Sequence, residues 1–449
     1  MSTPFRTPNI LLISLDDAVA FWNYRRVFGE VLQTPNLDRI CGISTAYHRA
    51  YCQAPVCSPS RASFMSGLSP VDSGITGPDP RFYERMPATA LWPAALKAAG
   101  WHCSSGGKMV RGAQPLPELV HNVLYSDGPK TFRMGRRPRI YATPERSERT
   151  EIMAFGGMRG GEATVHSKDD DTFYDHHVCQ SAIDFLDSYD RAAPFYREVG
   201  FCAPHGPWRT PRRFKELYNV RRFTQPSAWQ AGFGRTRAMN RAAPPNFRTS
   251  RQRFWRKSVR NYFSALSYVD DHVGQVWDAL KRSRHRDNTV VILLSDHGMH
   301  LGEHGRFRKH TLLEQVAQVP LIVHLPWQAE GVTITQPVGL TDVGPTVMDI
   351  AGLPPIPRTR GRSLLSPEPA RDTEAGRAIP TFLHDHASLR KGRYRLIRFG
   401  DGTTRLYDLE NDWWQTRDLG TGHSAFPEME KALTTCCAPV AHRPLRTAI

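Results

Sequence analysis

The chain has 449 residues, of which 40% are hydrophobic and 23% charged, and its formal net charge is +16. This composition excludes global disorder, and no run approaches the ~20 apolar residues of a membrane-spanning helix. Three explanations of the positive charge are open: a nucleic-acid partner, attraction of an anionic substrate, or surface solubility. Arginines crowd between residues 209 and 260 without zinc-finger spacing or an aromatic RNA-binding signature, so nucleic acid is not the favoured partner.

The beginning of the chain and the arrangement of its cysteines indicate the cellular compartment of the protein. Residues 1–8 run into a strand-like segment without a signal-peptide core. The eight cysteines are scattered, with no disulfide framework and no C-x-x-C pair typical of structural zinc. We therefore expect a cytoplasmic protein with no membrane partner.

The first buried strand is predicted over Asn9–Leu15, a nearly continuous apolar run that ends in Asp16-Asp17. Acids at the carboxyl end of such a strand lie where open α/β sheets place ligand sites. A solvated loop or a helix cap is the alternative for an isolated acid pair. Thr34 before Pro35 then predicts a capped helix start.

The stretch Cys57-Ser58-Pro59-Ser60-Arg61 places a thiol at a turn before a helix predicted over 60–66 and ended by Gly67. A thiol at or just before a helix N-terminus becomes more acidic. A buried, inert cysteine is the ordinary alternative.

A helix over 87–99 and a strand over 101–105 precede Gly106-Gly107-Lys108. This is not a phosphate-binding P-loop, because Met109 stands where that motif needs Ser or Thr. A lysine at a strand end could clamp an oxyanion or simply lie at the surface. The irregular stretches 113–172 and 221–252 are typical of substrate-facing insertions.

A helix over 173–188 and a strand over 194–201 lead to His205, held in a rigid loop by Pro204 and Pro207. A long helix follows, whose apolar stripe from Val259 to Leu280 indicates core packing. The next buried strand, Thr289–Ser295, ends in Asp296-His297-Gly298.

Two strand ends thus carry Asp16, Asp17, Asp296 and His297. Parallel strands bring their carboxyl ends to one edge of a sheet, so these side chains should converge. Three carboxylates and an imidazole would bind one divalent cation, with Ca²⁺ favoured and Mn²⁺ or Mg²⁺ possible.

The last third of the chain predicts a polar loop containing Lys309, a strand over 319–325 and a helix from 341. A Pro- and Arg-rich linker covers about 354–376. A hairpin over 394–409 and a final helix near 427–435 complete the chain.

In order and spacing, these motifs resemble the sulfatase family over most of the chain, and they look most like its iduronate-2-sulfatase and choline-sulfatase branches. The segments that carry the resemblance are Asp16-Asp17, Thr34–Ile40, the Cys57 stretch continued by Ala62-Ser63-Phe64, Gly107-Lys108, Pro204-His205, Asp296-His297-Gly298, Leu301–Gly305, Lys309 and Leu406–Leu409. The resemblance implies an alkaline-phosphatase-like α/β fold, in which a mainly parallel sheet lies between helices. It also implies a catalytic domain over 1–375 and a smaller antiparallel-sheet subdomain over 376–449.

The resemblance further implies that a formylglycine-generating enzyme oxidises Cys57 to formylglycine, which is then hydrated to a diol. Asp16, Asp17, Asp296, His297 and the diol would hold the metal, and one hydroxyl would attack sulfur to give a covalent sulfo-enzyme. Arg61 would hold the turn, Lys108 and Lys309 would clamp sulfate oxygens, and His205 would lie near the leaving oxygen. The second hydroxyl would then lose a proton and expel sulfate.

One position departs from the family. Relatives carry a histidine two or three residues after the lysine equivalent to Lys108, where this chain has Val110 and Arg111. The base that deprotonates the diol must therefore come from elsewhere, or Arg111 stabilises the anion instead.

The resemblance implies a small anionic sulfate ester as substrate. Two other functions remain as alternatives. Phosphonate monoester and phosphodiester hydrolases resemble sulfatases in fold and site but lack the lysine equivalent to Lys108, which favours sulfate esters. A polyanion-binding protein on an inactive scaffold would use residues 209–260, and the intact Cys57 and acid set argue against it. A homo-oligomer is possible.

Overall fold

The computed structural model describes residues 7–439 except 80, 110–115, 131–152, 156–157, 161–172, 207, 209, 235, 247–251 and 366–375. Its largest element is a seven-stranded mixed sheet. In spatial order the strands are β11 (Val332–Ile334), β2 (Thr45–Tyr47), β10 (Leu321–His324), β8 (Thr289–Ser295), β1 (Asn9–Leu15), β7 (Phe195–Gly200) and β4 (His102–Gly107). Only β10 runs antiparallel to its neighbours, so the sheet is mainly parallel.

Strand β1 lies near the centre of this sheet, in parallel register with β7 and β8. Its side chains alternate between the two faces. Leu11 and Ile13 join the hydrophobic cluster on one face, whereas Ile10 and Leu12 join the cluster on the other. This explains the continuous apolar run in the sequence, because both faces of β1 are buried.

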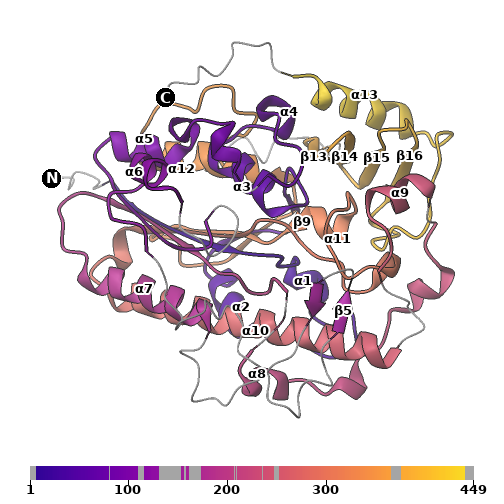
Figure 1. Cartoon of the computed structure of the whole chain (residues 1–449), viewed down its shortest axis with the longest axis horizontal. Helices are drawn as coiled ribbons and strands as arrows, with labels where there is room; N and C mark the ends of the chain where they lie inside the picture. The colour runs from indigo at the N-terminus through magenta and orange to yellow at the C-terminus, as the bar shows by residue number, and fades with distance from the viewer. Residues whose placement is uncertain are drawn as a thin grey trace.

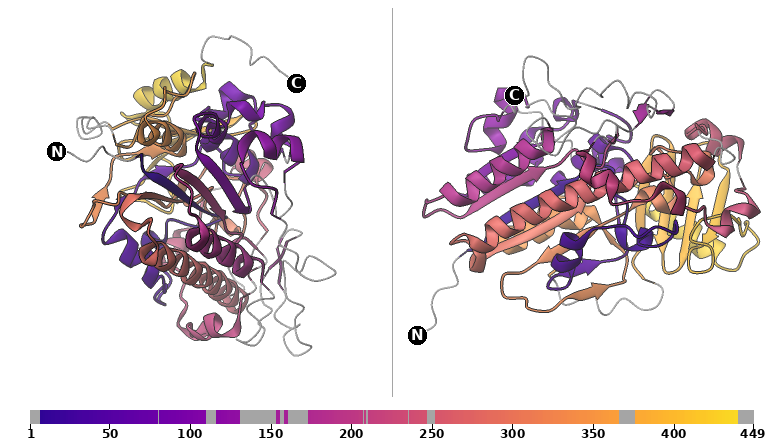
Figure 2. Two further views of the ribbon diagram at one scale, coloured as in Figure 1. Left: turned by 90° about the vertical axis from the view of Figure 1, so that its left-hand side faces the viewer. Right: turned by 90° about the horizontal axis from the view of Figure 1, so that it is seen from below.

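Helices cover both faces of the sheet (Figure 1). One face carries α2 (Pro35–Cys41), α7 (Tyr174–Ser188) and the 31-residue α10 (Gln252–Arg282), and α7 and α10 lie side by side (Figure 2). The opposite face carries α3 (Cys57–Ser66), α5 (Trp92–Ala98) and α12 (Val343–Ala351). Shorter helices are α1 (Phe21–Tyr24), α4 (Pro70–Ser73), α6 (Glu118–Leu124), α8 (Arg212–Glu216), α9 (Arg237–Ala242) and α11 (Glu314–Ala317).

A second, four-stranded antiparallel sheet lies at one end of the molecule, beside α13 (Phe426–Cys437) (Figure 1). Its strands are β13 (Ile379–Leu383), β14 (His386–Lys391), β15 (Tyr394–Arg398) and β16 (Thr404–Asp408). Buried Arg395 of this sheet binds Glu314 of α11, with Nη2 2.7 Å from Oε2. The second sheet and the body are thus joined by a buried ion pair.

The remaining strands are short. β3 (Ala50–Tyr51), β9 (Gln318–Val319) and β12 (Val338–Gly339) form one small sheet, and β5 (Met153–Phe155) and β6 (Met158–Gly160) form a hairpin. All eight cysteines are free thiols. Within the described part of the chain, no helix combines the length and apolar character needed to cross a membrane.

The mixed α/β fold with a smaller antiparallel sheet is confirmed, and three local expectations are corrected. Helix α2 begins at Pro35 as predicted, but Thr34 does not cap it; the Asp270 carboxylate accepts the amide protons of Asn36 and Leu37 instead. The strand predicted over 319–325 is two strands in different sheets, because Pro320 interrupts the ladder. The helix predicted over 87–99 is only Trp92–Ala98 after a 3₁₀ turn at Ala88–Ala90.

Much of the insertion predicted over 113–172 lies outside the described residues. Of its described part, 118–124 is helical, as α6. The stretch predicted to be irregular over 221–252 contains α9 and two 3₁₀ turns. The division into domains at residue 375 stays a prediction.

Candidate active site

Asp16 and Asp17 follow β1 directly, and both side chains are buried. Asp17 has a left-handed backbone with φ of 65°, a conformation that Asp tolerates better than most residues. The Tyr262 hydroxyl of α10 stabilises this turn, since it donates to the Asp17 carbonyl at 2.7 Å and accepts from Val19 N–H at 2.9 Å. The turn lets two consecutive acids approach the same point.

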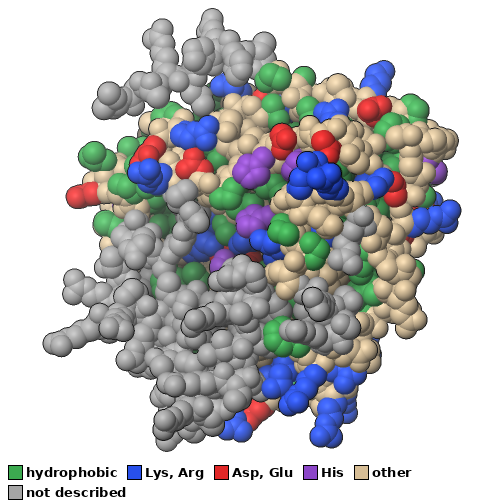
Figure 3. Space-filling view, turned by 45° about the vertical axis from the view of Figure 1, so that its right-hand side comes forward, with side chains coloured by type: hydrophobic (Ala, Val, Ile, Leu, Met, Phe, Trp, Pro, Cys, Tyr) green, Lys and Arg blue, Asp and Glu red, His purple; other side chains and the backbone are tan. Residues whose placement is uncertain are grey.

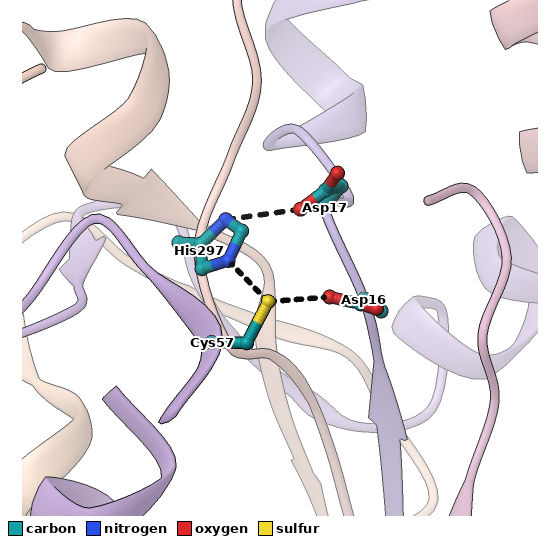
Figure 4. Close-up of side chains that lie close together, drawn as sticks. All are labelled: Asp16, Asp17, Cys57 and His297. Atoms are coloured by element: carbon teal, nitrogen blue, oxygen red, sulfur yellow. Dashed lines mark hydrogen bonds and ion pairs between the residues drawn. The ribbon is translucent and has the colours of Figure 1, made fainter. Parts of the chain in front are cut away.

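Cys57 is the first residue of α3, and its side chain reaches that point (Figure 4). Its Sγ lies 3.4 Å from Asp16 Oδ1, 3.3 Å from His297 Nε2 and 3.0 Å from Lys309 Nζ. Only 6% of the residue is exposed. The helix start predicted for this segment is confirmed, and Gly67 ends the helix at φ 70° as expected.

His297 and Asp296 follow β8, next to β1. His297 Nδ1 lies 3.3 Å from Asp17 Oδ1, on the opposite side of the ring from Cys57. Asp296 approaches from the side, with Oδ1 3.6 Å from His297 Nε2. Asp296 Oδ1 also accepts the backbone protons of Asp17 and His297, which ties the two strand ends together.

Arg61 lies one turn along α3 from Cys57 and is fully buried. Its Nε donates to Asp296 Oδ2 at 2.9 Å, and its Nη1 donates to the Lys108 carbonyl at 2.9 Å and the Met109 carbonyl at 3.2 Å. One guanidinium group therefore connects the cysteine helix to the end of β8 and to the segment after β4.

Lys108 follows β4, and its ammonium group binds Asp16 Oδ2. The backbone here is tightly packed, because a Cβ at Gly107 would lie 2.1 Å from the Gly200 carbonyl oxygen, and φ at Gly107 is 92°. Lys108 N–H donates to that same carbonyl at 2.7 Å. Glycine at 107 is therefore required where the lysine enters the site.

Lys309 comes from the polar loop after β8. Its Nζ lies 2.7 Å from Asp17 Oδ1. Two residues on, Thr311 Oγ1 lies 2.6 Å from His300 Nε2, and His300 Nδ1 lies 2.7 Å from buried Glu303. This buried hydrogen-bonded chain fixes the loop that delivers the lysine.

His205 lies at the edge of the cluster, with Nε2 3.9 Å from Asp17 Oδ2 and 27% of its side chain exposed. Buried Asp175 of α7 holds the loop before it, because its carboxylate accepts the amide protons of Cys202 and Ala203 at 2.7 Å each. The structure thus places every residue predicted for the site in or beside this cluster, but Asp296 is not among the four whose ligand atoms lie closest together. Their roles in chemistry remain predictions.

Opposite charges in this cluster shift one another's pKa values toward the ionised forms. Burial alone would raise the pKa of Asp16, but neighbouring cations, led by Lys108, hold it well below its usual value. Burial alone would lower the pKa of Lys309, but Asp17 and other negative groups hold it well above its usual value. Asp296 and other negative neighbours similarly outweigh burial at His297 and raise its pKa to about 9. Asp16 is therefore ionised, and the negative groups of the site stabilise the cationic side chains beside them.

The donor set fits a divalent cation. Among the described residues, ligand atoms of Asp16, Asp17, Cys57 and His297 all lie within 4.8 Å of one another. Asp17 Oδ2 is buried with no hydrogen-bond partner, so it can act as a ligand. Carboxylate oxygens suit Ca²⁺ or Mg²⁺, and the imidazole also suits Mn²⁺.

One face of the molecule is hollowed near its middle, and histidine and basic side chains gather there (Figure 3). Such a concave, positively charged surface suits an anionic ligand.

Sequence reasoning missed several supporting residues, among them Tyr262, Asp175 and Ser60, whose hydroxyl donates to the Asp296 carbonyl at 2.5 Å. Tyr262 belongs to the apolar stripe of α10, and its hydroxyl gave no separate signal. Val110 and Arg111, where the family histidine is replaced, lie outside the described residues.

Comparison with known proteins defines the class. The sulfatase family model matches residues 8–353, and a second model, N-sulphoglucosamine sulphohydrolase C-terminal, matches residues 302–436. The first match spans more than half of the chain, so the protein belongs to the sulfatase family and is a sulfatase enzyme.

Similar proteins are sulfatases of several kinds. Choline-sulfatase of Rhizobium meliloti is 29% identical, over 90% of this chain and 81% of the relative. A sulfatase of Formosa agariphila is 28% identical over the same shares, 90% and 81%. Mouse iduronate 2-sulfatase is 26% identical over 78% of this chain and 70% of the relative. The expected likeness to the choline-sulfatase and iduronate-2-sulfatase branches is confirmed.

Solved structures share the fold. One, determined with its substrate D-glucosamine-2-N,6-O-disulfate, has a TM-score of 0.70 and 20% identity, covering 96% of this chain and 97% of that chain. The phosphonate monoester hydrolase of Agrobacterium radiobacter has a TM-score of 0.71 and 20% identity, covering 97% and 100%. The alkaline-phosphatase-like fold is therefore shared by enzymes of both classes.

Proposed function

We propose that this protein hydrolyses a small anionic sulfate monoester through a formylglycine formed from Cys57 and a covalent sulfo-enzyme intermediate. The observation that carries the proposal is the position of Cys57, whose Sγ lies within 3.4 Å of an aspartate, a histidine and a lysine. Membership of the sulfatase family supports the same chemistry.

Asp16, Asp17, Asp296, His297 and residue 57 would hold one divalent cation, with Ca²⁺ favoured and Mn²⁺ or Mg²⁺ as alternatives. Such a cation lowers the pKa of a bound hydroxyl and neutralises a sulfate oxygen. Within the site, Arg61 keeps Asp296 and the Lys108 segment in place through the contacts described above.

Residues of this chain supply the groups that take part in the reaction. One hydroxyl of the hydrated formylglycine attacks sulfur, the S–O bond to the alcohol breaks, and the alcohol oxygen takes up a proton. Lys108 and Lys309 stabilise the sulfate oxygens, and His205, at the edge of the cluster, is placed to serve the leaving oxygen. The second hydroxyl then loses its proton, the C=O bond re-forms, and sulfate leaves.

The histidine that relatives use at this last step is absent at positions 110 and 111. We propose that another group takes the proton or that Arg111 stabilises the anion.

The test combines mass spectrometry of the peptide spanning Cys57 with rates on an aryl sulfate and the matching aryl phosphonate. We expect formylglycine at position 57 and faster turnover of the sulfate. The same preparation with Cys57→Ala should be inactive. A fully active enzyme with an unmodified thiol would refute the mechanism.

The same experiment separates the two alternatives. Faster turnover of the phosphonate would assign the protein to the phosphonate monoester and phosphodiester hydrolases. Absence of any ester hydrolysis by converted protein, together with salt-dependent nucleic-acid binding, would favour a polyanion-binding function. A formylglycine-generating enzyme as maturation partner, a cytoplasmic location and a homo-oligomer remain proposals from the sequence.

A further inference from the structure

The carboxylate of Asp175 connects helix α7 to the loop that carries His205. Asp175 lies in the first turn of α7 and is 4% exposed. Its Oδ1 accepts the amide proton of Cys202 and its Oδ2 accepts that of Ala203, each at 2.7 Å. Both oxygens of this buried group therefore bind two consecutive residues of the loop that follows β7.

The same hydrogen-bonded chain continues to His205. The Cys202 carbonyl accepts the His205 amide proton at 2.9 Å, so the segment that Asp175 holds is itself bound to the histidine. The ring has an anchor of its own, because Nδ1 lies 2.6 Å from the Gly206 carbonyl oxygen. A carbonyl can only accept, so Nδ1 carries a proton. Nε2, which lies 3.9 Å from Asp17 Oδ2, is thus the ring nitrogen left to exchange a proton with a substrate.

The two loop amides need a carboxylate at position 175. Burial raises the pKa of Asp175 to about 6, although the hydrogen bonds from the two amides favour the charged form. The group is therefore mostly ionised at pH 7 and accepts at both oxygens. An asparagine has one acceptor oxygen, and its NH₂ group would face a second N–H donor. Asp175→Asn keeps the shape of the side chain but would release one of the two amides.

We propose that Asp175 is a positioning residue that sets the place of His205 at the leaving oxygen of the sulfate ester. The inference rests on the proposed function, in which the S–O bond breaks, its electron pair stays on the alcohol oxygen, and that oxygen takes up a proton through His205. Proton transfer matters most for a poor leaving group, and it depends steeply on geometry. Loss of the Asp175 carboxylate should therefore slow esters of poor leaving groups selectively.

The first test compares kcat/KM for 4-nitrophenyl sulfate, which has a reactive leaving group, with kcat/KM for phenyl sulfate, which has a less reactive one. This ratio includes cleavage of the S–O bond but not the later breakdown of the sulfo-enzyme. We expect Asp175→Asn to lower kcat/KM about 100-fold for phenyl sulfate and less than about threefold for 4-nitrophenyl sulfate. The matched control Asp187→Asn, at an exposed aspartate of the same helix, should change neither value.

A double-mutant cycle separates this role from a general loss of structure. His205→Ala should lower kcat/KM for phenyl sulfate about 100-fold or more. Adding Asp175→Asn to it should cause no further loss, because both changes remove the same group from the leaving oxygen. Losses that multiply in the double variant would overturn the inference, as would equal losses on the two esters in Asp175→Asn.

Hydrogen exchange tests the geometry without turnover. In Asp175→Asn the amides of Cys202 and Ala203 should lose protection, whereas those of β1 should keep it. Unchanged protection of the two loop amides would overturn the inference. Loss of protection throughout the chain, or failure of the variant to fold, would also overturn it, because the carboxylate would then serve the whole fold. If wild-type protein with formylglycine at position 57 hydrolysed neither ester, the proposed function itself would be contradicted, and the inference with it.

Discussion

At the scale of single residues, the cationic and acidic side chains of the site form matched pairs. Lys108 binds Asp16, Lys309 binds Asp17, and Arg61 binds Asp296. Because these pairs are buried, the loss of one member leaves its partner as an uncompensated charge. An added divalent cation gives the site a net positive charge, which suits a sulfate ester.

Lys309→Met tests the role of one such charge. We expect kcat for an aryl sulfate to fall roughly 100- to 1,000-fold, because the sulfate oxygens lose a buried cationic donor. Steady-state kinetics on protein with confirmed conversion of Cys57 measures this. Lys281→Met, on the last turn of α10, serves as the control and should leave kcat within about twofold of wild type.

Asp17→Asn tests the metal site without disturbing its backbone. Asn tolerates the left-handed conformation that φ of 65° requires, so the fold should be retained. Loss of a charged ligand should weaken cation binding by at least tenfold, measured by calorimetric titration of EDTA-treated protein. Unchanged affinity would remove Asp17 from the proposed ligand set.

At the scale of elements, short and mainly apolar runs located β1, β7 and β8, and hence the edge where the acids meet. The order of the strands in the sheet was not predictable from these runs. The left-handed turn at Asp17 and the tight packing of Gly107 against Gly200 were not predictable from residue type alone, because both depend on contacts with distant segments. A second role of α10, beyond core packing, was also not predictable from residue type. Its Tyr262 hydroxyl binds the Asp17 carbonyl just after β1.

Tyr262→Phe tests this link between α10 and the acid turn. The Val19 amide and the Asp17 carbonyl would lose a buried partner, which should lower the free energy of unfolding by about 1–3 kcal/mol. Denaturant titration measures the change, with Tyr83→Phe as a control outside the site. If cation affinity and stability both matched wild type, the hydroxyl would not be needed to position Asp17.

At the scale of the whole molecule, Glu314 of α11 joins the four-stranded sheet to Tyr51 of the short strand β3. Its carboxylate accepts from Arg395 Nε and from the Tyr51 hydroxyl, each at 2.8 Å. The resemblance predicted two structural units, but it gave no sign of this buried contact, because arginine and glutamate are ordinary surface residues in a sequence.

Glu314→Gln should therefore destabilise the junction. Removal of the charge leaves buried guanidinium groups uncompensated, at a cost of about 3–5 kcal/mol. Hydrogen exchange should show greater loss of protection in β13–β16 than in β1. Glu428→Gln, at an exposed pair with Lys391, is the control and should change the free energy of unfolding by less than about 1 kcal/mol. Uniform loss of protection in both sheets would contradict a local role.

The separation of Cys57 and Lys309 in the sequence also determines how long the ribosome takes to make Lys309 after Cys57. They are 252 residues apart, although Nζ contacts Sγ in the folded protein. At about 5–20 residues per second, ribosomal synthesis of that interval takes roughly 10–50 s. During this period neither β8 nor the lysine loop exists to cover the thiol. The oxidation that we propose for Cys57 would therefore meet a more accessible thiol on the growing chain than in the folded protein, where the residue is 6% exposed.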